Sequence, residues 1–213
     1  MKDWHDSGLA LMRKHWFFPT PILNRRGFRA RQRHILVRFS DLGIEPGLVV
    51  ALEKEGFTEP FEVQCEAIPD AMLGRDICCR APTGSGKTLA FGLPMISRTA
   101  KAESKRPTSL ILTPTRELAE QIRNVLHPLA RSAGLGVLSV YGGVSYRNQL
   151  RGLEDGVEIL VACPGRLLDL IDRKALTLKH ANIIVLDEAD RMADMGFMEP
   201  VCRIIEMCSK ERQ

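Results

Sequence analysis

The chain has 213 residues, of which 45% are hydrophobic and 26% are charged. This is enough apolar sequence for one hydrophobic core, so one soluble globular domain is expected rather than two. No apolar run reaches the roughly 20 residues that cross a bilayer, and Asp3 and Asp6 stand where a secretory signal carries basic residues. We therefore expect no membrane contact and a cytoplasmic location. The six cysteines lack the paired spacing of a zinc site, so reduced and mostly buried thiols are expected.

The first 38 residues differ in charge from the rest of the chain. They contain nine Lys and Arg and two Asp and Glu, a balance of +7, whereas the remaining residues carry −3. The stretch "RRGFRARQRHILVR", Arg25–Arg38, would attract a phosphate backbone, and a solvated tail without a partner is an equal interpretation. A transit peptide is a third interpretation, which the Arg enrichment favours and the early aspartates oppose. We expect a basic extension, residues 1–38, ahead of a folded domain, residues 39–213.

Short apolar runs alternate with helical patterns after residue 38. Segments such as Arg116–Ala130 and Gly165–Arg173 have apolar residues every three or four positions, and Pro128 is expected to kink or end the first. This alternation predicts an α/β fold, a doubly wound and mostly parallel sheet with helices on both faces and its ligand site at the carboxyl ends of the strands. The expected strands are Asp76–Ala81, Ser109–Pro114, Gly136–Tyr141, Val157–Ala162 and Asn182–Asp187.

The stretch "APTGSGKT", Ala81–Thr88, lies between a predicted strand and a predicted helix, as a phosphate-binding P-loop does. Glycines in such a loop let backbone N–H groups approach phosphate oxygens, the lysine adds a positive charge, and the final hydroxyl is a ligand for Mg²⁺. Ala81 stands where the strict pattern has glycine, and a plain glycine turn is the alternative interpretation. The residues expected to bind the phosphates of ATP are Thr83, Gly84, Ser85, Gly86, Lys87 and Thr88.

The run "NIIVLDEAD" ends in three carboxylates, Asp187, Glu188 and Asp190. Like charges this close repel one another unless a cation lies among them, and Mg²⁺ on a polyphosphate is such a cation. We predict that Asp187 holds Mg²⁺ directly or through water, and that Glu188 orients or deprotonates the attacking water, with Lys87 as a further catalytic residue. The alternative, a simple helix cap, fits Asp190 best.

In content and order, these motifs resemble the DEAD-box family of ATP-dependent RNA helicases. The stretch "GFTEPFEVQ" is similar to the family's Q motif, which implies that Gln64 recognises the adenine edge and that Phe57 stacks on the ring. Phe39 stands where the family has its isolated upstream aromatic residue, which implies that Phe39 also takes part in binding ATP. Phe61 and Glu62 replace the family's usual Thr-Pro, a departure in the loop before Gln64. The resemblance implies a RecA-like P-loop domain that uses ATP and Mg²⁺.

Three further stretches resemble the family's RNA-facing motifs: "PTRELA", "GG" and "CPGR". Each follows a predicted strand, and such arginines and open backbone N–H groups suit phosphate oxygens without reading bases. The resemblance implies sequence-independent binding of single-stranded or duplex RNA. Cys163 replaces the family's threonine, and pairing of Arg166 with Asp169 is an alternative to phosphate binding. The predicted RNA-binding residues are Pro114, Thr115, Arg116, Gly142, Gly143, Pro164, Gly165 and Arg166.

The resemblance ends before the family's Ser-Ala-Thr motif, and the second RecA-like domain is also missing from the sequence. In the family Asp190 couples the ATP site to that motif, so here we expect Asp190 to cap its helix or face water. The first hypothesis is the ATP-binding domain of an RNA helicase, unable to unwind RNA without a second RecA-like domain. A stand-alone nucleotide- and RNA-binding module is the second hypothesis, and a P-loop ATPase that acts on something other than RNA is the third.

Overall fold

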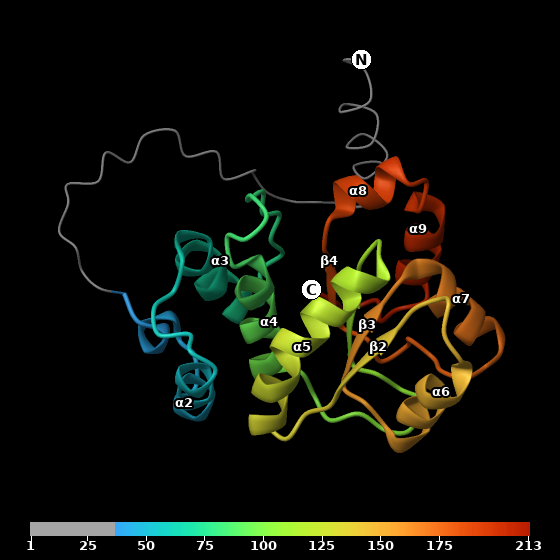
Figure 1. Cartoon of the computed structure of the whole chain (residues 1–213), viewed down its shortest axis with the longest axis horizontal. Helices are drawn as coiled ribbons and strands as arrows, with labels where there is room; N and C mark the ends of the chain where they lie inside the picture. Colours follow the sequence, from blue (N-terminus) through green and yellow to red (C-terminus); the bar gives the residue numbers. More distant parts are fainter. Residues whose placement is uncertain (1–36) are drawn as a thin grey trace, which may run out of the picture. The chain divides into compact units, whose positions relative to one another are not determined.

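Four parallel strands form the centre of the structure, a computed structural model that describes residues 37–213 (Figure 1). Their order across the sheet is β2-β3-β1-β4, and every neighbouring pair is parallel. Leu110 of β1 lies opposite Leu160 of β3 and Ile184 of β4. The strands are β1 (Ser109–Leu112), β2 (Val137–Val140), β3 (Ile159–Ala162) and β4 (Ile183–Leu186). The predicted parallel sheet is therefore confirmed.

Helices cover both faces of this sheet. Alternate residues of each strand point to opposite faces, and β1 and β3 are apolar and buried along their length, so each face needs a covering layer. Ile111 and Val161 belong to a hydrophobic core that also contains residues of α2, α4 and α5, whereas α6, α7 and α9 lie on the other side (Figure 1). The helical elements are η1 (Phe39–Leu42), α2 (Pro46–Lys54), α3 (Glu62–Met72), α4 (Lys87–Arg98), α5 (Arg116–Ser132), α6 (Tyr146–Asp155), α7 (Pro164–Asp172), α8 (Ala189–Asp194) and α9 (Met198–Glu206).

The helix that follows the P-loop, α4, is packed closely against α5. Gly92 makes this approach possible, because a Cβ atom at this position would lie only 2.3 Å from Cδ2 of Leu126. Leu93 of α4 and Leu126 of α5 are fully buried. The middle of α4 is thus held against α5, whose own start follows β1.

The strand predicted over Asp76–Ala81 is wrong: this segment has no regular secondary structure, and Ile77 is 41% exposed. A strand needs lateral hydrogen bonds to a neighbour, and the described residues supply none beside this segment. Cys78 and Cys79 are exposed with it, so the expectation of mostly buried thiols is also wrong. All six cysteines are free, and only Cys208 is fully buried.

Two helix expectations also need correction. Helix α5 continues through Pro128 to Ser132, because the burial of Leu129 and Ala130 stabilises the turn that lacks the proline N–H. The helix that Asp190 was expected to cap is α8, whose N-cap is Glu188 and not Asp190. It ends at Asp194, and Gly196, whose φ of +77° belongs to the left-handed region, separates it from α9.

The predicted basic extension, residues 1–38, lies outside the described residues except for Val37 and Arg38, and its boundary stays a prediction. Across residues 37–213, no helix combines the length and the apolar character needed to cross a membrane.

Candidate functional site

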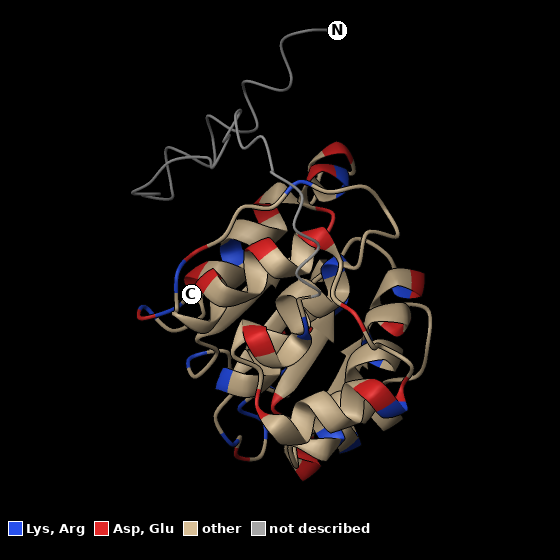
Figure 2. Cartoon of the chain, turned by 90° about the vertical axis from the view of Figure 1, so that its left-hand side faces the viewer, with Lys and Arg blue, Asp and Glu red and all other residues tan. Residues whose placement is uncertain are grey.

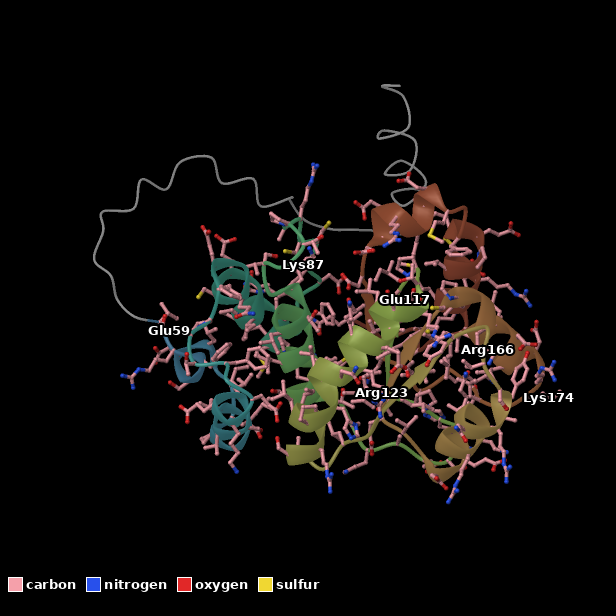
Figure 3. The ribbon with its side chains drawn as sticks, in the orientation of Figure 1. Glu59, Lys87, Glu117, Arg123, Arg166 and Lys174 are labelled. Carbon is pink, nitrogen blue, oxygen red and sulfur yellow. The ribbon has the colours of Figure 1, made fainter. Side chains whose placement is uncertain are left out.

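Loops that follow the four parallel strands meet at one edge of the sheet, as the sequence predicts. "PTRELA" follows β1, "GG" follows β2, "CPGR" follows β3, and Asp187 follows β4. In the view of Figure 3, Glu117 at the start of α5 lies between Lys87 and Arg166. The residues predicted to bind RNA therefore lie on the loops after β1, β2 and β3, and Asp187, predicted to hold Mg²⁺, lies on the loop after β4.

The P-loop curls around the ammonium group of Lys87. Nζ of Lys87 donates hydrogen bonds to the carbonyl oxygens of Ala81 at 2.5 Å and Pro82 at 2.9 Å, and the Ser85 hydroxyl donates to Pro82 at 2.7 Å. Gly84 and Gly86 have φ values of +82° and +88°, which residues with a side chain rarely adopt. Helix α4 begins immediately afterwards, so its unpaired N–H groups and a positive charge are presented together. This arrangement suits a phosphate group.

Gln64 joins α3 to the P-loop. Its Oε1 atom accepts a hydrogen bond from the backbone N–H of Phe61 at 2.9 Å, and its Nε2 atom donates to the carbonyl of Gly86 at 2.9 Å. The residue is 1% exposed, and a Cβ atom at Gly86 would lie 2.4 Å from Nε2. The sequence did not predict this link. The amide retains one N–H and one lone pair of its oxygen that are able to pair with the adenine edge. Its contact with adenine stays a prediction.

The three aromatic residues near Gln64 have different environments. Phe39 is 2% exposed and packs in the hydrophobic core. Its contact with ATP stays a prediction. Phe57 is half-buried and packs against the same core. Phe61, where the family has threonine, is 59% exposed, and its ring lies beside Gly86.

Asp187 is a largely buried carboxylate, with 9% of the residue exposed. Burial, followed by the negative charge of Glu188, raises the pKa of Asp187, whereas a hydrogen bond from the Glu188 N–H and the positive charge of Lys87 lower it. The ammonium group of the P-loop is therefore close enough to Asp187 to stabilise its charge.

Glu188 has a left-handed backbone, with φ of 51° and ψ of 48°, which is uncommon for a residue other than glycine. Its Oε2 atom forms an ion pair with Nη1 of Arg191 at 3.1 Å. Arg191 was not predicted, although its position three residues after Glu188 on a helix would have indicated the pair. Asp190 is exposed and accepts a hydrogen bond from the Arg191 N–H at 3.0 Å. The Asp190 side chain thus faces water, one of the two placements expected for it, and the coupling role that the family resemblance implies is not tested.

The donor set fits a magnesium ion that is held mainly by phosphate oxygens. Across residues 37–213, no three His, Cys, Asp or Glu side chains gather into a metal-binding cluster. Asp187 supplies a buried carboxylate, and the Thr88 hydroxyl makes no hydrogen bond to another described residue. One carboxylate and one hydroxyl leave most positions around the ion to phosphate and water, as is usual for Mg²⁺.

The predicted RNA-binding residues divide into open and enclosed positions. Arg116 is exposed, and its guanidinium carbon lies 5.3 Å from the centre of the Tyr141 ring. Gly142, Gly143 and Gly165 are exposed as well. Thr115 caps α5 through its hydroxyl, which accepts a hydrogen bond from the Leu118 N–H at 3.3 Å, and Pro114 and Pro164 are buried.

Arg166 is enclosed, with 8% of its side chain exposed. Its guanidinium donates to Oε1 of Gln149 at 3.2 Å and to the carbonyl of Val144 at 3.1 Å. The alternative pairing with Asp169 is present at 3.9 Å. Tyr146 and Gln149 were missed by the sequence analysis, although their spacing of three residues places both on one face of α6.

Comparison with known proteins gives one consistent relationship. The DEAD/DEAH box helicase family matches residues 61–213. The chain is 44% identical over 177 residues to the DEAD-box ATP-dependent RNA helicase CshA of Streptococcus pneumoniae, covering 83% of this chain and 34% of the relative. It is 44% identical over 175 residues to the RNA helicase CrhR of Synechocystis, covering 82% of this chain and 35% of that protein.

Solved structures agree with the sequence relatives. A DEAD box protein from the hyperthermophile Methanococcus jannaschii matches with a TM-score of 0.76 and 36% identity, over 83% of this chain and 48% of that one. The chain thus spans about a third of the length of these curated relatives and about half of this solved chain. The match covers the sheet, the P-loop and all four strand-end loops, and this chain belongs to the DEAD/DEAH box helicase family.

Proposed function

We propose that this chain is the ATP-binding domain of an ATP-dependent RNA helicase, in which ATP hydrolysis drives RNA unwinding once a second RecA-like domain is present. One observation carries the proposal: the buried carboxylate of Asp187 lies within electrostatic reach of Lys87, whose P-loop is wrapped around its ammonium group. A cation and an anion so arranged suit a metal-bound polyphosphate, with the ammonium on the phosphates and the carboxylate on the metal.

In the proposed site, Lys87 would give up its hydrogen bonds to the carbonyl oxygens of Ala81 and Pro82 and donate to phosphate oxygens instead. The N–H groups of Gly84 to Thr88 would surround the same oxygens, and Thr88 and Asp187 would hold Mg²⁺. When bound, Mg²⁺ would neutralise negative charge that develops on the phosphates.

Glu188 would orient the attacking water or accept its proton. Its carboxylate is now paired with Arg191 at 3.1 Å, so it would have to leave this partner to reach the water. The left-handed backbone at Glu188 turns the chain directly after β4 and separates the direction of this side chain from that of Asp187. Gln64 and Phe57 would hold adenine beside the P-loop.

RNA would bind along the other strand-end loops through its phosphates, without recognition of base identity. The exposed Arg116 and the backbone N–H groups at Gly142, Gly143 and Gly165 are the available donors. On the side of the described residues that faces the viewer in Figure 2, Lys and Arg are interspersed with Asp and Glu. The function would be exercised in the cytoplasm, where ATP and RNA are available, and that location stays a prediction.

The test joins this chain to a second RecA-like domain taken from one of its relatives. ATPase activity that increases with RNA, together with unwinding of a short RNA duplex, is the expected result for the fusion. Because groups supplied in trans contribute roughly 10³ to 10⁵ in rate in phosphoryl transfer, residues 1–213 alone should hydrolyse ATP very slowly.

A matched control is the Glu188→Gln fusion, which should bind ATP and RNA but lose hydrolysis. Fusions made with two different relatives that bind ATP yet show neither RNA-stimulated hydrolysis nor unwinding would overturn the helicase proposal.

A further inference from the structure

Five side chains from α6 and α7, and from the residue that follows α7, form a connected cluster beside the loop that joins β2 to α6. The guanidinium carbons of Arg166 and Arg173 lie 4.0 Å and 4.5 Å from the centre of the Tyr146 ring. The Tyr146 hydroxyl donates a hydrogen bond to Asp169, and Arg173 donates to the same carboxylate at 2.9 Å. Gln149 completes the cluster by accepting from Arg166. We call these residues the Tyr146 cluster.

The cluster encloses the guanidinium group of Arg166. Nη1 donates to Gln149 and Nη2 to the Val144 carbonyl, Nε lies 3.9 Å from Asp169, and one face rests on the Tyr146 ring. Because only 8% of the side chain is exposed, a phosphate oxygen has little access to this group. Arg173 differs, because 58% of its side chain is exposed.

The same cluster fixes the loop between β2 and α6 at both ends. Nε2 of Gln149 donates to the Tyr141 carbonyl at 3.2 Å, and Arg166 donates to the Val144 carbonyl at 3.1 Å. Gly142 and Gly143 lie between these two carbonyls and are exposed. Within residues 37–213, the backbone N–H groups of these glycines donate no hydrogen bond. The loop therefore has fixed ends and free donors between them.

We propose that Tyr146 is a positioning residue for RNA: it holds Arg166 on the Val144 carbonyl, so that the N–H groups of Gly142 and Gly143 are fixed toward the RNA phosphates. Arg166 then acts on RNA through the loop and is not itself a phosphate ligand. This inference rests on the RNA binding proposed above and replaces the direct role that the sequence predicts for Arg166. Fixed donors favour binding because less conformational freedom is lost when the phosphate arrives.

Salt dependence distinguishes a phosphate ligand from a positioning residue. Each phosphate neutralised on a single strand contributes about 0.7 to the slope of log K against log salt concentration. The affinity of the fusion protein for a single-stranded RNA would be measured with ATP over a range of KCl concentrations. Arg116→Gln, at an exposed arginine, is the control and should reduce the magnitude of the slope by about 0.7.

Arg166→Gln and Tyr146→Leu should weaken RNA binding about tenfold or more at every salt concentration and leave the slope unchanged, as expected when no phosphate contact is lost. Tyr146→Phe keeps the ring beside both guanidinium groups, so it should restore most of the affinity. A slope reduced by about 0.7 in Arg166→Gln would identify a direct phosphate ligand and overturn the proposal. Wild-type affinity in Tyr146→Leu would overturn it as well.

NMR relaxation of the backbone amides in the RNA-free protein tests the cluster without any RNA. The order parameters of Gly142 and Gly143 should be about 0.85 in wild type and Tyr146→Phe and should fall below about 0.6 in Tyr146→Leu, while the amides of β3 stay rigid in all three proteins. If neither the wild type nor any variant binds RNA, the proposed RNA function fails, whereas unchanged order parameters at Gly142 and Gly143 in Tyr146→Leu would refute the positioning role itself.

Discussion

At Asp187, stability and the proposed function make opposite demands. Burial and the charge of Glu188 raise the pKa of this carboxyl group, so its ionised form is less stable in the folded protein than in the unfolded chain. The favourable contribution of the carboxyl group is fully present below its ordinary pKa and is lost as the pH rises through the raised value. At neutral pH the ligand-free protein therefore holds a destabilising charge that a metal ion would neutralise.

We predict that Asp187→Asn stabilises the ligand-free protein at neutral pH and gives no such gain in acid, below the ordinary pKa of aspartate. Urea unfolding at several pH values would measure this difference. With Mg²⁺ and ATP the order should reverse, because a ligand at 100 times its dissociation constant adds about 2.7 kcal/mol to the wild type. A variant that is less stable than wild type at neutral pH without ligand would contradict the prediction.

Single residues differ in how far the sequence could predict them. Lys87 and Asp187 were predictable because a glycine-rich loop before a helix and a strand that ends in carboxylates both indicate a metal-bound polyphosphate. Gln64 was predicted as an adenine contact, yet its link to Gly86 depends on how α3 and α4 lie in space, and no sequence spacing contains that information. Tyr146 was missed for the same reason, since the two arginines beside its ring come from α7 and from the residue that follows α7.

At the scale of elements, the P-loop is held between α3 and α4. The link from Gln64 to Gly86 fixes the loop to α3, while the packing of Gly92 on Leu126 fixes α4 to α5. Both contacts require glycine, but for different reasons: Gly86 has positive φ and a close neighbour, whereas Gly92 has only the close neighbour. A change in either helix would therefore be transmitted to the phosphate-binding residues.

Gly86→Ala should destabilise the protein by about 1–3 kcal/mol and abolish nucleotide binding, because the new Cβ atom combines backbone strain with overlap on Gln64 and Phe61. Gly84→Ala is the matched control. Its φ is similarly positive but nothing lies within 4 Å of the new Cβ atom, so it should show the strain without the overlap. Urea unfolding of both variants measures the difference, and equal losses would show that contact with α3 does not matter.

The segment 76–81 shows how elements can be mispredicted. Its apolar pattern is typical of a strand, but such a pattern indicates only which conformation the segment prefers. A strand also requires a neighbouring strand to which its backbone is hydrogen-bonded. The four strands that were predicted correctly lie next to one another in the sheet, so each has a partner. Element boundaries were less certain, as the continuation of α5 beyond Pro128 demonstrates.

Thiol labelling tests this correction. Cys78 is exposed, whereas Cys208 is buried in surroundings that raise its pKa to about 12. At pH 8 a thiol reagent should modify Cys78 at least 100 times faster than Cys208, because Cys208 is covered by other residues and its raised pKa keeps it protonated at this pH. The modified residues would be identified by mass spectrometry of digested protein. Slow labelling of Cys78 would indicate that segment 76–81 is covered in solution.

For the whole described molecule, one sheet carries two groups of residues that are predicted to contact ligands. The P-loop and Asp187 form one group, and the loops after β1, β2 and β3 form the other. This division was predictable because parallel strands place all their carboxyl ends together. The roles of Arg116 and Arg166 were not distinguishable from sequence, since both follow strands in similar motifs but only one is exposed.

The central claim is that this chain binds ATP with Mg²⁺ at the P-loop, and equilibrium binding of a fluorescent ATP analogue to residues 1–213 tests it most directly. We predict saturable, Mg²⁺-dependent binding that unlabelled ATP displaces. Lys87→Ala should weaken binding at least tenfold, whereas Arg116→Gln, in the other group, should leave it unchanged. Equal affinity in wild type and Lys87→Ala would contradict the claim.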